Sequence, residues 1–328
     1  MNNPLAQMSS NLITCPKTGK QYTNDTNLPM EICYLIMHFS SLYDGKLISR
    51  YNVSATDLLK PVKAIVLQIQ HPYEDDQLTD ISTLAKSAKG TMMHEALEQV
   101  LTGIPGYTLE KRSDRKVGNW NISGKFDIVH NGEIKDLKTT GNFTLKLLAE
   151  DQARMQPGMS MDEMLQTIPN YAKWQIQLSL YRWLNPELVT KPFGKILISL
   201  TDGAGFDKQP VDSEHTFPLL PTEQIEQFIA AKLNQVDHYL DNPDQPLPRC
   251  SDTETGYRLP EYKLKYRDKN GKYRAYPGGT FNNKSEFDQF CNSKMKLGDV
   301  IESTPAKAVL CHYCKARSVC DQFNSIQG

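Results

Sequence analysis

The chain has 328 residues, with 37 Lys and Arg against 38 Asp and Glu and a formal net charge of −1 at pH 7. This length allows a substantial core, and the balanced charge excludes a general attraction for nucleic acid, so any basic surface must be local. No apolar stretch reaches 18 residues and the N-terminus lacks a signal-peptide layout, so we expect a soluble, cytoplasmic protein with no membrane partner.

Residues 1–80 are expected to form an N-terminal helical region. Met30–Leu42 has apolar side chains at helical spacing, and a helix is expected to start at Ser54 and to end before Pro61. Val62–Ile69 is apolar enough to be a buried element. No chemistry is assigned to this region.

An amphipathic helix is predicted from Leu84 to Leu101, because its apolar residues recur at helical spacing. Gly90 and His94 lie four residues apart in it, and His94 falls on or beside the inward face. A lone histidine in such a position is more often a packed side chain than a ligand, although neutral imidazole commonly binds metals.

Asn131-Gly132 predicts a two-residue hairpin turn, since both residues tolerate positive φ. The predicted strands around it are Trp120–Val129 and Glu133–Lys138, and a further strand is expected at Tyr107–Arg112. Cross-strand partners then have numbers that add to 263. Asp127 is expected to face Asp136, and Lys125 to face Lys138.

Two carboxylates opposite each other destabilise a sheet unless a shared proton, a salt bridge or a cation compensates them. Asp136 and Lys138 point to one face of their strand, while Phe126, Ile128 and Leu137 point to the other and can face a core. Two oxygen ligands beside an ammonium suit Mg²⁺ or Mn²⁺ and a phosphate under hydrolysis. The alternative is a solvated hairpin with cross-strand ion pairs.

The following segments continue an α/β pattern, so residues 81–245 are expected to form a mixed β-sheet core flanked by helices. In the predicted helix Asn170–Leu184, one stripe carries Gln177 and Tyr181, which is also the pattern of a packed core face. Asp241–Pro248 has three prolines and is expected to be a linker to residues 246–328. The other predicted elements are helix Phe143–Ala149, loop Met155–Ile168, strand Phe193–Leu200 and a helix capped by Thr222 that ends near Leu240.

Four short motifs together resemble the PD-(D/E)XK nuclease superfamily, in its RecB-like branch, which includes CRISPR-associated RecB-like exonucleases and phage-encoded relatives. The resemblance covers about Leu84 to Leu200 and extends to the C-terminal cysteines. Each motif is weak alone, but four in order at suitable spacings are specific. They are Gly90-Thr91-Met92-Met93-His94, Gly124-Lys125-Phe126-Asp127, Asp136-Leu137-Lys138 and Gln177-Leu178-Ser179-Leu180-Tyr181.

The resemblance implies a restriction-endonuclease-like fold and a role for each motif residue. His94, Asp127, Asp136 and the Leu137 carbonyl would hold Mg²⁺ or Mn²⁺. Lys138 would orient or activate the attacking water and stabilise charge on the phosphate. Gln177 and Tyr181 would position the nucleic acid or the site.

Seven cysteines, clustered late in the chain, favour metal ligation in a reducing compartment over a disulfide framework. Cys311, Cys314 and Cys320 can wrap one metal, and their spacing resembles both zinc knuckles and the last three cysteines of iron–sulfur RecB-like nucleases. Cys250 is the preferred fourth ligand, while a 4Fe-4S cluster and Zn²⁺ stay open. Other candidate ligands are Cys15, Cys33, Cys291 and His312.

A basic and aromatic stretch precedes the last cysteines. Interleaved tyrosines and cations suit single-stranded nucleic acid, while the alternative is an ordinary hairpin turning at Asn270-Gly271 with solvated lysines. The candidate contacts are Lys263, Lys265, Tyr266, Arg267, Lys272, Tyr273 and Arg274.

The sequence thus predicts a DNA nuclease that hydrolyses phosphodiester bonds, from ends or in single strands, with a cysteine-bound metal module at its C-terminus. Asp127, Asp136 and Lys138 are the predicted catalytic residues. One alternative is a non-catalytic DNA-binding or scaffold protein on the same fold, which would not need the paired carboxylates. Another is a restriction-type endonuclease, which the histidine and glutamine motifs disfavour.

Overall fold

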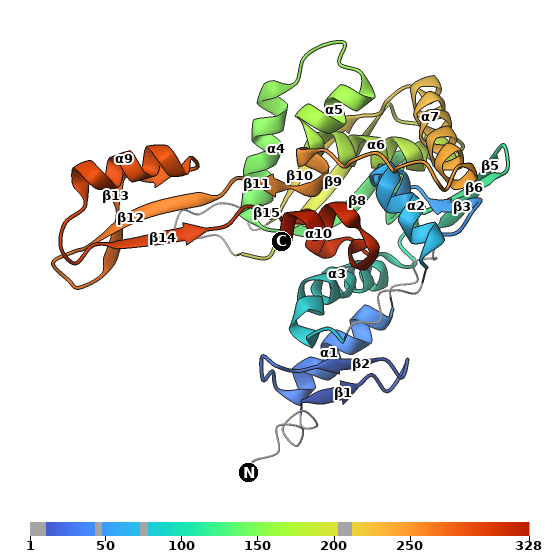
Figure 1. Ribbon diagram of the computed structural model, residues 1–328. Helices are drawn as coiled ribbons and strands as arrows, with labels where there is room; N and C mark the ends of the chain where they lie inside the picture. Colours follow the sequence, from blue (N-terminus) through green and yellow to red (C-terminus); the bar gives the residue numbers. More distant parts are fainter. Residues whose placement is uncertain (1–10, 43–47, 73–77, 203–211, 328) are drawn as a thin grey trace. The chain divides into compact units, whose positions relative to one another are not determined.

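A computed structural model describes residues 11–42, 48–72, 78–202 and 212–327 of the chain (Figure 1). The chain divides into two units, Met1–Gln245 and Pro246–Gly328. Within the described residues, no helix has the length and apolar character needed to cross a membrane.

The first unit is built on a five-stranded mixed sheet in the order β10-β9-β8-β7-β4. β8 and β9 run parallel and the other neighbours run antiparallel. The chain passes from β8 to β9 through three helices, as a parallel pair requires a long crossover. The strands are β4 (Tyr107–Leu109), β7 (Ile128–His130), β8 (Glu133–Thr140), β9 (Phe193–Leu200) and β10 (Asp212–Pro218).

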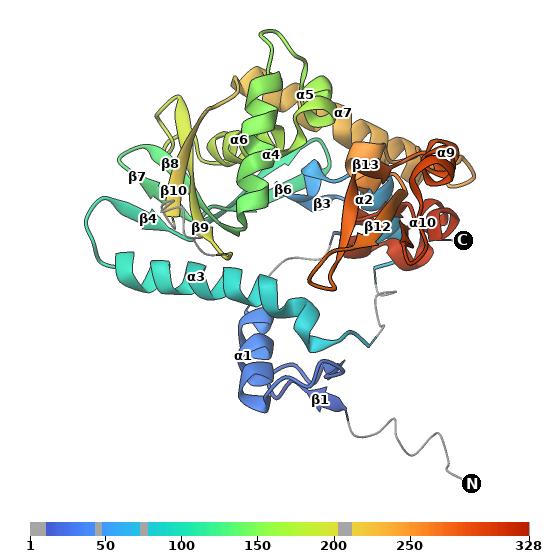
Figure 2. The same cartoon turned by 90° about the vertical axis from the view of Figure 1, so that its left-hand side faces the viewer.

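Helices pack on this sheet as expected for a mixed α/β fold (Figure 2). α3 (Ala85–Leu101) contacts β8 and β4, and α6 (Pro169–Leu184) contacts β8 and β9. Both helices were predicted, and each brings motif residues to β8. The other helices are α4 (Asn142–Arg154), α5 (Met161–Thr167) and α7 (Thr222–Asp241).

The predicted turn at Asn131-Gly132 is confirmed. Both residues have positive φ, 51° and 78°, and the pairs His130–Glu133, Val129–Ile134 and Ile128–Lys135 follow the predicted register. The ladder ends there, so Asp127 lies beyond it rather than in a paired position opposite Asp136.

Two predicted strands are broken, and both breaks fall at the same place. Trp120–Val129 was predicted as one strand, but β6 (Trp120–Lys125) belongs to a separate sheet of order β3-β6-β5, and β7 to the main sheet. Tyr107–Arg112 likewise splits into β4 and β5 (Arg112–Val117) at Glu110, whose φ of 47° does not fit a strand. Lys125 therefore pairs with Arg112, and the prediction that it faces Lys138 is wrong.

Hydrogen bonds join the two breaks. The Glu110 N–H donates to the Asp127 carbonyl at 2.9 Å, and the Phe126 N–H donates to the Lys111 carbonyl at 3.2 Å. The chain thus passes from one sheet to the other at two places, and these two places lie next to each other. Because these crossings are a tertiary arrangement, β-propensity along the sequence could not show them.

The N-terminal part packs on α3. β1 (Leu12–Thr14), β2 (Gln21–Thr23) and α1 (Met30–Ser41) bury one apolar cluster with η3 (Ile81–Leu84), and Cys15 and Cys33 lie inside it. The helix expected from Ser54 is only a short turn, η2 (Asp57–Leu59), and Pro61 then caps α2. The remaining elements are β3 (Asn52–Ser54) and the buried helix α2 (Val62–Gln70).

Two further predictions need correction. The predicted loop Met155–Ile168 contains α5, because Ser160 and Glu163 form a capping box that starts a helix after the Pro-Gly turn. Thr222 is the first residue of α7 and not its cap, a position taken by Pro221 without a side-chain bond.

The second unit has a three-stranded sheet in the order β13-β12-β14 with α9 (Lys284–Lys294) on one face. Leu264 and Phe287 are fully buried between them. The cysteine segment follows in short turns. The elements are α8 (Asp252–Thr255), β11 (Tyr257–Arg258), β12 (Glu261–Arg267), β13 (Tyr273–Phe281), β14 (Val300–Thr304), β15 (Lys307–Ala308), η4 (Leu310–Tyr313), η5 (Arg317–Val319) and α10 (Asp321–Gln327).

Candidate active site

Asp127 occupies the break between β6 and β7, where its side chain is free of the strand ladder. Its Oδ2 accepts a hydrogen bond from the Leu137 N–H at 2.7 Å. His94 reaches it from α3, with Nδ1 3.4 Å from the same oxygen. The histidine motif and the aspartate motif therefore meet, and the backbone of β8 orients the carboxylate between them.

Asp136 and Lys138 lie on one face of β8, as the alternation of a strand predicts. Lys138 Nζ is 2.7 Å from Asp136 Oδ2. Asp136 is 2% exposed, so the ion pair compensates a carboxylate that water cannot reach. Phe126, Ile128 and Leu137, predicted to face a core, are all buried.

Gln177 and Tyr181 complete the surroundings of Asp136 from α6. The Gln177 Nε2 donates to Asp136 Oδ1 at 2.9 Å and to the Tyr181 hydroxyl oxygen at 3.0 Å. Both side chains are buried, at 6% and 5% exposure. The resemblance implies that Gln177 and Tyr181 position either the nucleic acid or the site. These contacts fit the second role, since they hold Asp136 in place.

Packing explains why the aspartate motif has a glycine at position 124. A Cβ atom there would lie 2.6 Å from Leu184 Cδ1 and 3.2 Å from the Tyr181 ring. The glycine therefore lets α6 approach β6 closely, which brings Gln177 within reach of Asp136.

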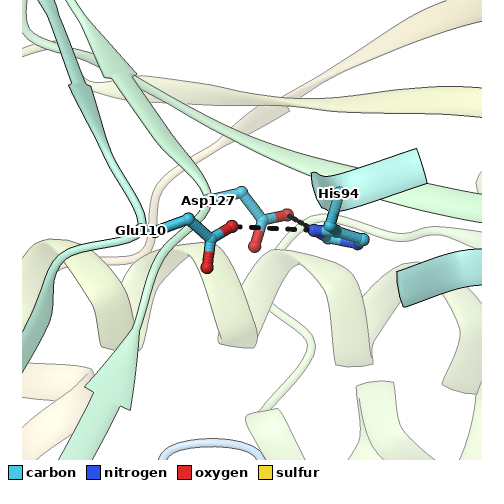
Figure 3. Close-up of side chains that lie close together, drawn as sticks. All are labelled: His94, Glu110 and Asp127. Atoms are coloured by element: carbon cyan, nitrogen blue, oxygen red, sulfur yellow. Dashed lines mark ion pairs between the residues drawn. The ribbon is translucent and has the colours of Figure 1, made fainter. Parts of the chain in front are cut away.

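Glu110 is a site residue that the sequence analysis missed (Figure 3). Its Oε1 is 3.8 Å from His94 Nδ1, and its Oε2 is 2.6 Å from Lys125 Nζ. Ligating atoms of His94, Glu110 and Asp127 all lie within 4.8 Å of one another. No motif marks Glu110 in the sequence. In the structure its positive φ marks the position, since such strain in a non-glycine residue clusters at functional sites.

Burial and charge act against each other in this cluster. Burial alone would lower the pKa of His94, but hydrogen bonds to Asp127 and Glu110 outweigh it and raise that pKa to about 10. Burial raises the pKa of Asp136 to about 6, against the charge of Lys138. The pKa of Lys138 is raised because the attraction of Asp136 exceeds the effect of burial. Lys138 is therefore a cation at neutral pH.

The donor atoms fit a hard divalent cation. Carboxylate oxygens with one imidazole nitrogen are ligands that Mn²⁺ and Mg²⁺ accept. His94 and Asp127 are in contact, whereas Asp136 is held by Lys138 and Gln177 and is outside the group of atoms within 4.8 Å. Ligation by Asp136 and by the Leu137 carbonyl stays a prediction.

The four predicted cysteine ligands belong to the second unit and are partly buried, without disulfides. Burial, followed by the charges of Cys314 and Cys320, raises the pKa of Cys311, so these three thiols are neighbours. Cys250 is tied to α10, which follows Cys320, by two 2.8 Å hydrogen bonds between its backbone and the Gln322 amide. Cys15 and Cys33 lie in the N-terminal apolar cluster of the first unit.

Among the described residues, the sulfurs do not form a group of three within 4.8 Å. Thiolates bound to one Zn²⁺ at about 2.3 Å lie roughly 3.8 Å apart. The sulfur positions are therefore wider than a zinc site requires.

The basic and aromatic stretch forms the hairpin of β12 and β13, closed by residues 268–272, which include Asn270-Gly271. Alternation places Lys263, Lys265 and Arg267 on the face opposite Leu264 and α9. Three of its cations are paired with acids: Lys263 with Glu261, Lys265 with Glu302 and Arg274 with Asp268. Tyr273 is 50% exposed, and the Tyr266 ring packs against that of Tyr276 in a tilted arrangement.

No protein-family model matches this chain, and no curated protein matches it. Several solved structures are similar to it, among them the following three. The structure of SSO0001 has 16% identity and a TM-score of 0.40, over 64% of this chain and 87% of that one. A phage-related exonuclease from Haemophilus somnus has 14% identity and a TM-score of 0.36, over 58% and 96%. The alkaline exonuclease LHK-Exo from Laribacter hongkongensis has 9% identity and a TM-score of 0.36, over 59% and 91%. Similarity at this level does not assign an activity, so the function has to be argued from the residues of the site.

Proposed function

We propose that this protein is a metal-dependent deoxyribonuclease of the PD-(D/E)XK superfamily, in its RecB-like branch. The observation that carries the proposal is the convergence of Asp127, Asp136 and Lys138 with His94 beside β8, the central strand of the main sheet. Four motifs that are separate in sequence contribute to one cluster, including the glutamine that holds Asp136. Chance motif matches would have no reason to meet in this way.

Mg²⁺ or Mn²⁺ would be held by His94, Asp127, Asp136 and the Leu137 carbonyl. When bound, it lowers the pKa of a water molecule and neutralises a non-bridging phosphate oxygen. The carboxylate of Asp127 is held for this role by the Leu137 N–H, and that of Asp136 by Gln177. Because of these contacts, both carboxylates are already oriented before the substrate binds.

Lys138 supplies a fixed positive charge beside the scissile phosphate. Its raised pKa keeps the ammonium protonated at neutral pH, so it donates hydrogen bonds and does not act as a base. An ammonium that is held in place beside a buried carboxylate stabilises negative charge that grows on the phosphate during attack. It also orients the attacking water.

The proposed substrate is DNA, degraded from ends or as single strands. The second unit would contribute its basic hairpin, with Lys263, Lys265, Tyr266, Arg267, Lys272, Tyr273 and Arg274 as the proposed contacts. Charged side chains that already have acidic neighbours can exchange them for phosphates at small cost. The cysteines Cys250, Cys311, Cys314 and Cys320 would bind a 4Fe-4S cluster or Zn²⁺ that braces this unit.

The test of the nuclease is cleavage of linear and circular DNA, single- and double-stranded, with either end labelled. Mg²⁺ or Mn²⁺ should support cleavage, EDTA should stop it, and the labelled linear DNA should shorten from an end. Asp136→Ala and Lys138→Ala should be inactive, whereas the exposed Lys146→Ala should match the wild type. Cleavage that survives both site variants would reject the proposal, and so would no cleavage with any metal.

Metal analysis with an absorption spectrum tests the cysteine module. A 4Fe-4S cluster gives a thiolate charge-transfer band at roughly 400 nm, whereas Zn²⁺ gives none. Cys314→Ser should lose the metal, and Cys291→Ser in the apolar cluster under α9 should keep it. Protein purified without air and free of both metals would reject the module.

A further inference from the structure

Glu110 faces the cation site from the break between β4 and β5. Its backbone N–H donates to the Asp127 carbonyl, and the two carboxylates point toward His94 from neighbouring turns of chain (Figure 3). The positive φ of Glu110 turns the chain out of β4 at this point. Glycine adopts such a φ at less cost, so the turn by itself does not call for a glutamate.

The two oxygens of Glu110 have different neighbours. Lys125 Nζ lies 2.6 Å from Oε2, and Oε1 is 3.8 Å from His94 Nδ1. His94 Nδ1 is in turn 3.4 Å from Asp127 Oδ2. Lys125 therefore holds the carboxylate and leaves its second oxygen directed at the histidine and the aspartate.

The spacing of these three atoms matches a shared cation. Ligands about 2.1 Å from one ion lie at most roughly 4.2 Å apart, and all three atoms lie within 4.8 Å. Side-chain movements of a few tenths of an ångström would close the set. Space is present as well, because the three residues line a small cavity together with Glu98 and three aliphatic side chains.

We propose that Glu110 is a ligand of the divalent cation, with His94 and Asp127, in the site of the proposed nuclease. The donor set is one imidazole nitrogen and two carboxylate oxygens, which favours Mn²⁺ or Mg²⁺. Asp136 faces the same centre from the side of Lys138 and Gln177. The centre thus has a third carboxylate, which none of the four motifs contains.

The test is Mn²⁺ binding to the full chain without nucleic acid, followed by electron paramagnetic resonance and calorimetry, for wild type, Glu110→Gln and Glu98→Gln. Glutamine keeps the size of the side chain and an acceptor oxygen for His94, but it loses the ligating charge. Glu98 is the matched control, since it lines the same cavity one helical turn after His94 and lies outside the group of three.

We expect Glu110→Gln to weaken Mn²⁺ binding at least about tenfold or to remove a bound ion, and Glu98→Gln to weaken it less than about threefold. Thermal unfolding in EDTA shows whether each variant folds, and Glu110→Ala serves if the glutamine variant does not. Unchanged Mn²⁺ binding in the folded Glu110 variant would overturn the proposal, as would an equal loss in Glu98→Gln. Cleavage of DNA is measured in a separate assay. If Glu110 is needed for Mn²⁺ binding but the protein cuts no DNA, the proposed nuclease function is rejected and the proposal that Glu110 is a metal ligand stands.

Discussion

The two units of the chain have net charges of opposite sign, and their charged side chains differ in burial and in the partners that they contact. Residues 1–245 carry 23 Lys and Arg against 29 Asp and Glu, and residues 246–328 carry 14 against 9. The net charge of −1 therefore hides an acidic and a basic unit. In the first, the half-buried carboxylate of Asp127 and the buried carboxylate of Asp136 each have a defined donor. In the second, partly exposed cations pair with partly or fully exposed acids, Lys263 with Glu261 on its own strand and Lys265 with Glu302 on the adjacent strand.

This difference between the two units follows from how far water reaches the charged groups. A buried charge must be paired or it costs several kilocalories per mole, so its geometry is specified. An exposed ion pair contributes about 0–1 kcal/mol and exchanges easily for another partner. The first arrangement suits catalysis, where atoms must be held in place, and the second suits reversible contact with phosphates. Substitutions at each kind of charged group test this contrast.

Asp136→Asn should lower DNA cleavage by on the order of 10³-fold, because it removes a charge from the cation site and from the partner of Lys138. Cleavage rates at saturating Mn²⁺ measure the effect. The exposed Asp162→Asn is the control and should match the wild type. A residual rate above a tenth of the wild-type rate would show that Asp136 does not act in the reaction.

Gln177→Leu should lower cleavage by roughly 10- to 100-fold, because it leaves Asp136 Oδ1 without its donor. The free energy of unfolding should fall by about 1–3 kcal/mol, the usual cost of an unsatisfied buried polar atom. Urea unfolding and cleavage kinetics are measured together. Gln175→Leu on the same helix is the comparison, since its bond is to the Pro218 carbonyl, away from the site. Equal losses of activity in the two variants would mean that Gln177 has only a structural role.

Lys263→Ala with Lys265→Ala should weaken binding of single-stranded DNA about three- to tenfold and lower the salt dependence by about one unit per lost phosphate contact. Glu302→Gln should strengthen binding slightly, because it frees Lys265. Fluorescence anisotropy at several salt concentrations gives both values. Mn²⁺ affinity should be unchanged in these variants. A double variant with wild-type affinity and slope would remove the hairpin from the DNA-binding surface.

The smallest effect is on stability and concerns His94. Its pKa is about 10 in the folded protein against 6.5 in the unfolded chain, so its ion pairs stabilise the fold fully below pH 6.5. This stabilisation is lost as pH rises to 10. In EDTA, the melting temperature of the wild type should fall more between pH 7 and pH 10 than that of His94→Gln. Parallel curves for the two proteins would mean that the histidine is neutral in the metal-free fold.

Local rules were enough for the hairpin and the long helices. Asn131-Gly132 determines its turn through two positive φ values, and the register of β7 and β8 follows from it. The periodicity of α3 and α6 likewise places His94 and Gln177 on identified helices. Each of these predictions depends on residues that are close in sequence.

Contacts between distant segments could not be read in this way. Glu110 looked like a strand residue, and it lies beside His94 and Asp127 because the chain changes sheets at this point. Asp127 was expected opposite Asp136, yet the ladder ends one pair earlier and its carboxylate binds the Leu137 N–H. The hairpin lysines looked available for phosphate, and the pairing of Lys265 with Glu302 on β14 became visible only in the folded sheet.

The sequence by itself therefore determined the mixed α/β architecture, the turn that precedes β8 and the types of side chain in the site. Turn chemistry and periodicity act over a few residues, which is why they survive in a single sequence. The tertiary structure decided which carboxylates meet, which are buried and which donors hold them. Those outcomes depend on where two sheets diverge and on how closely α6 packs over Gly124, and both arise from the packing of segments that are far apart along the chain.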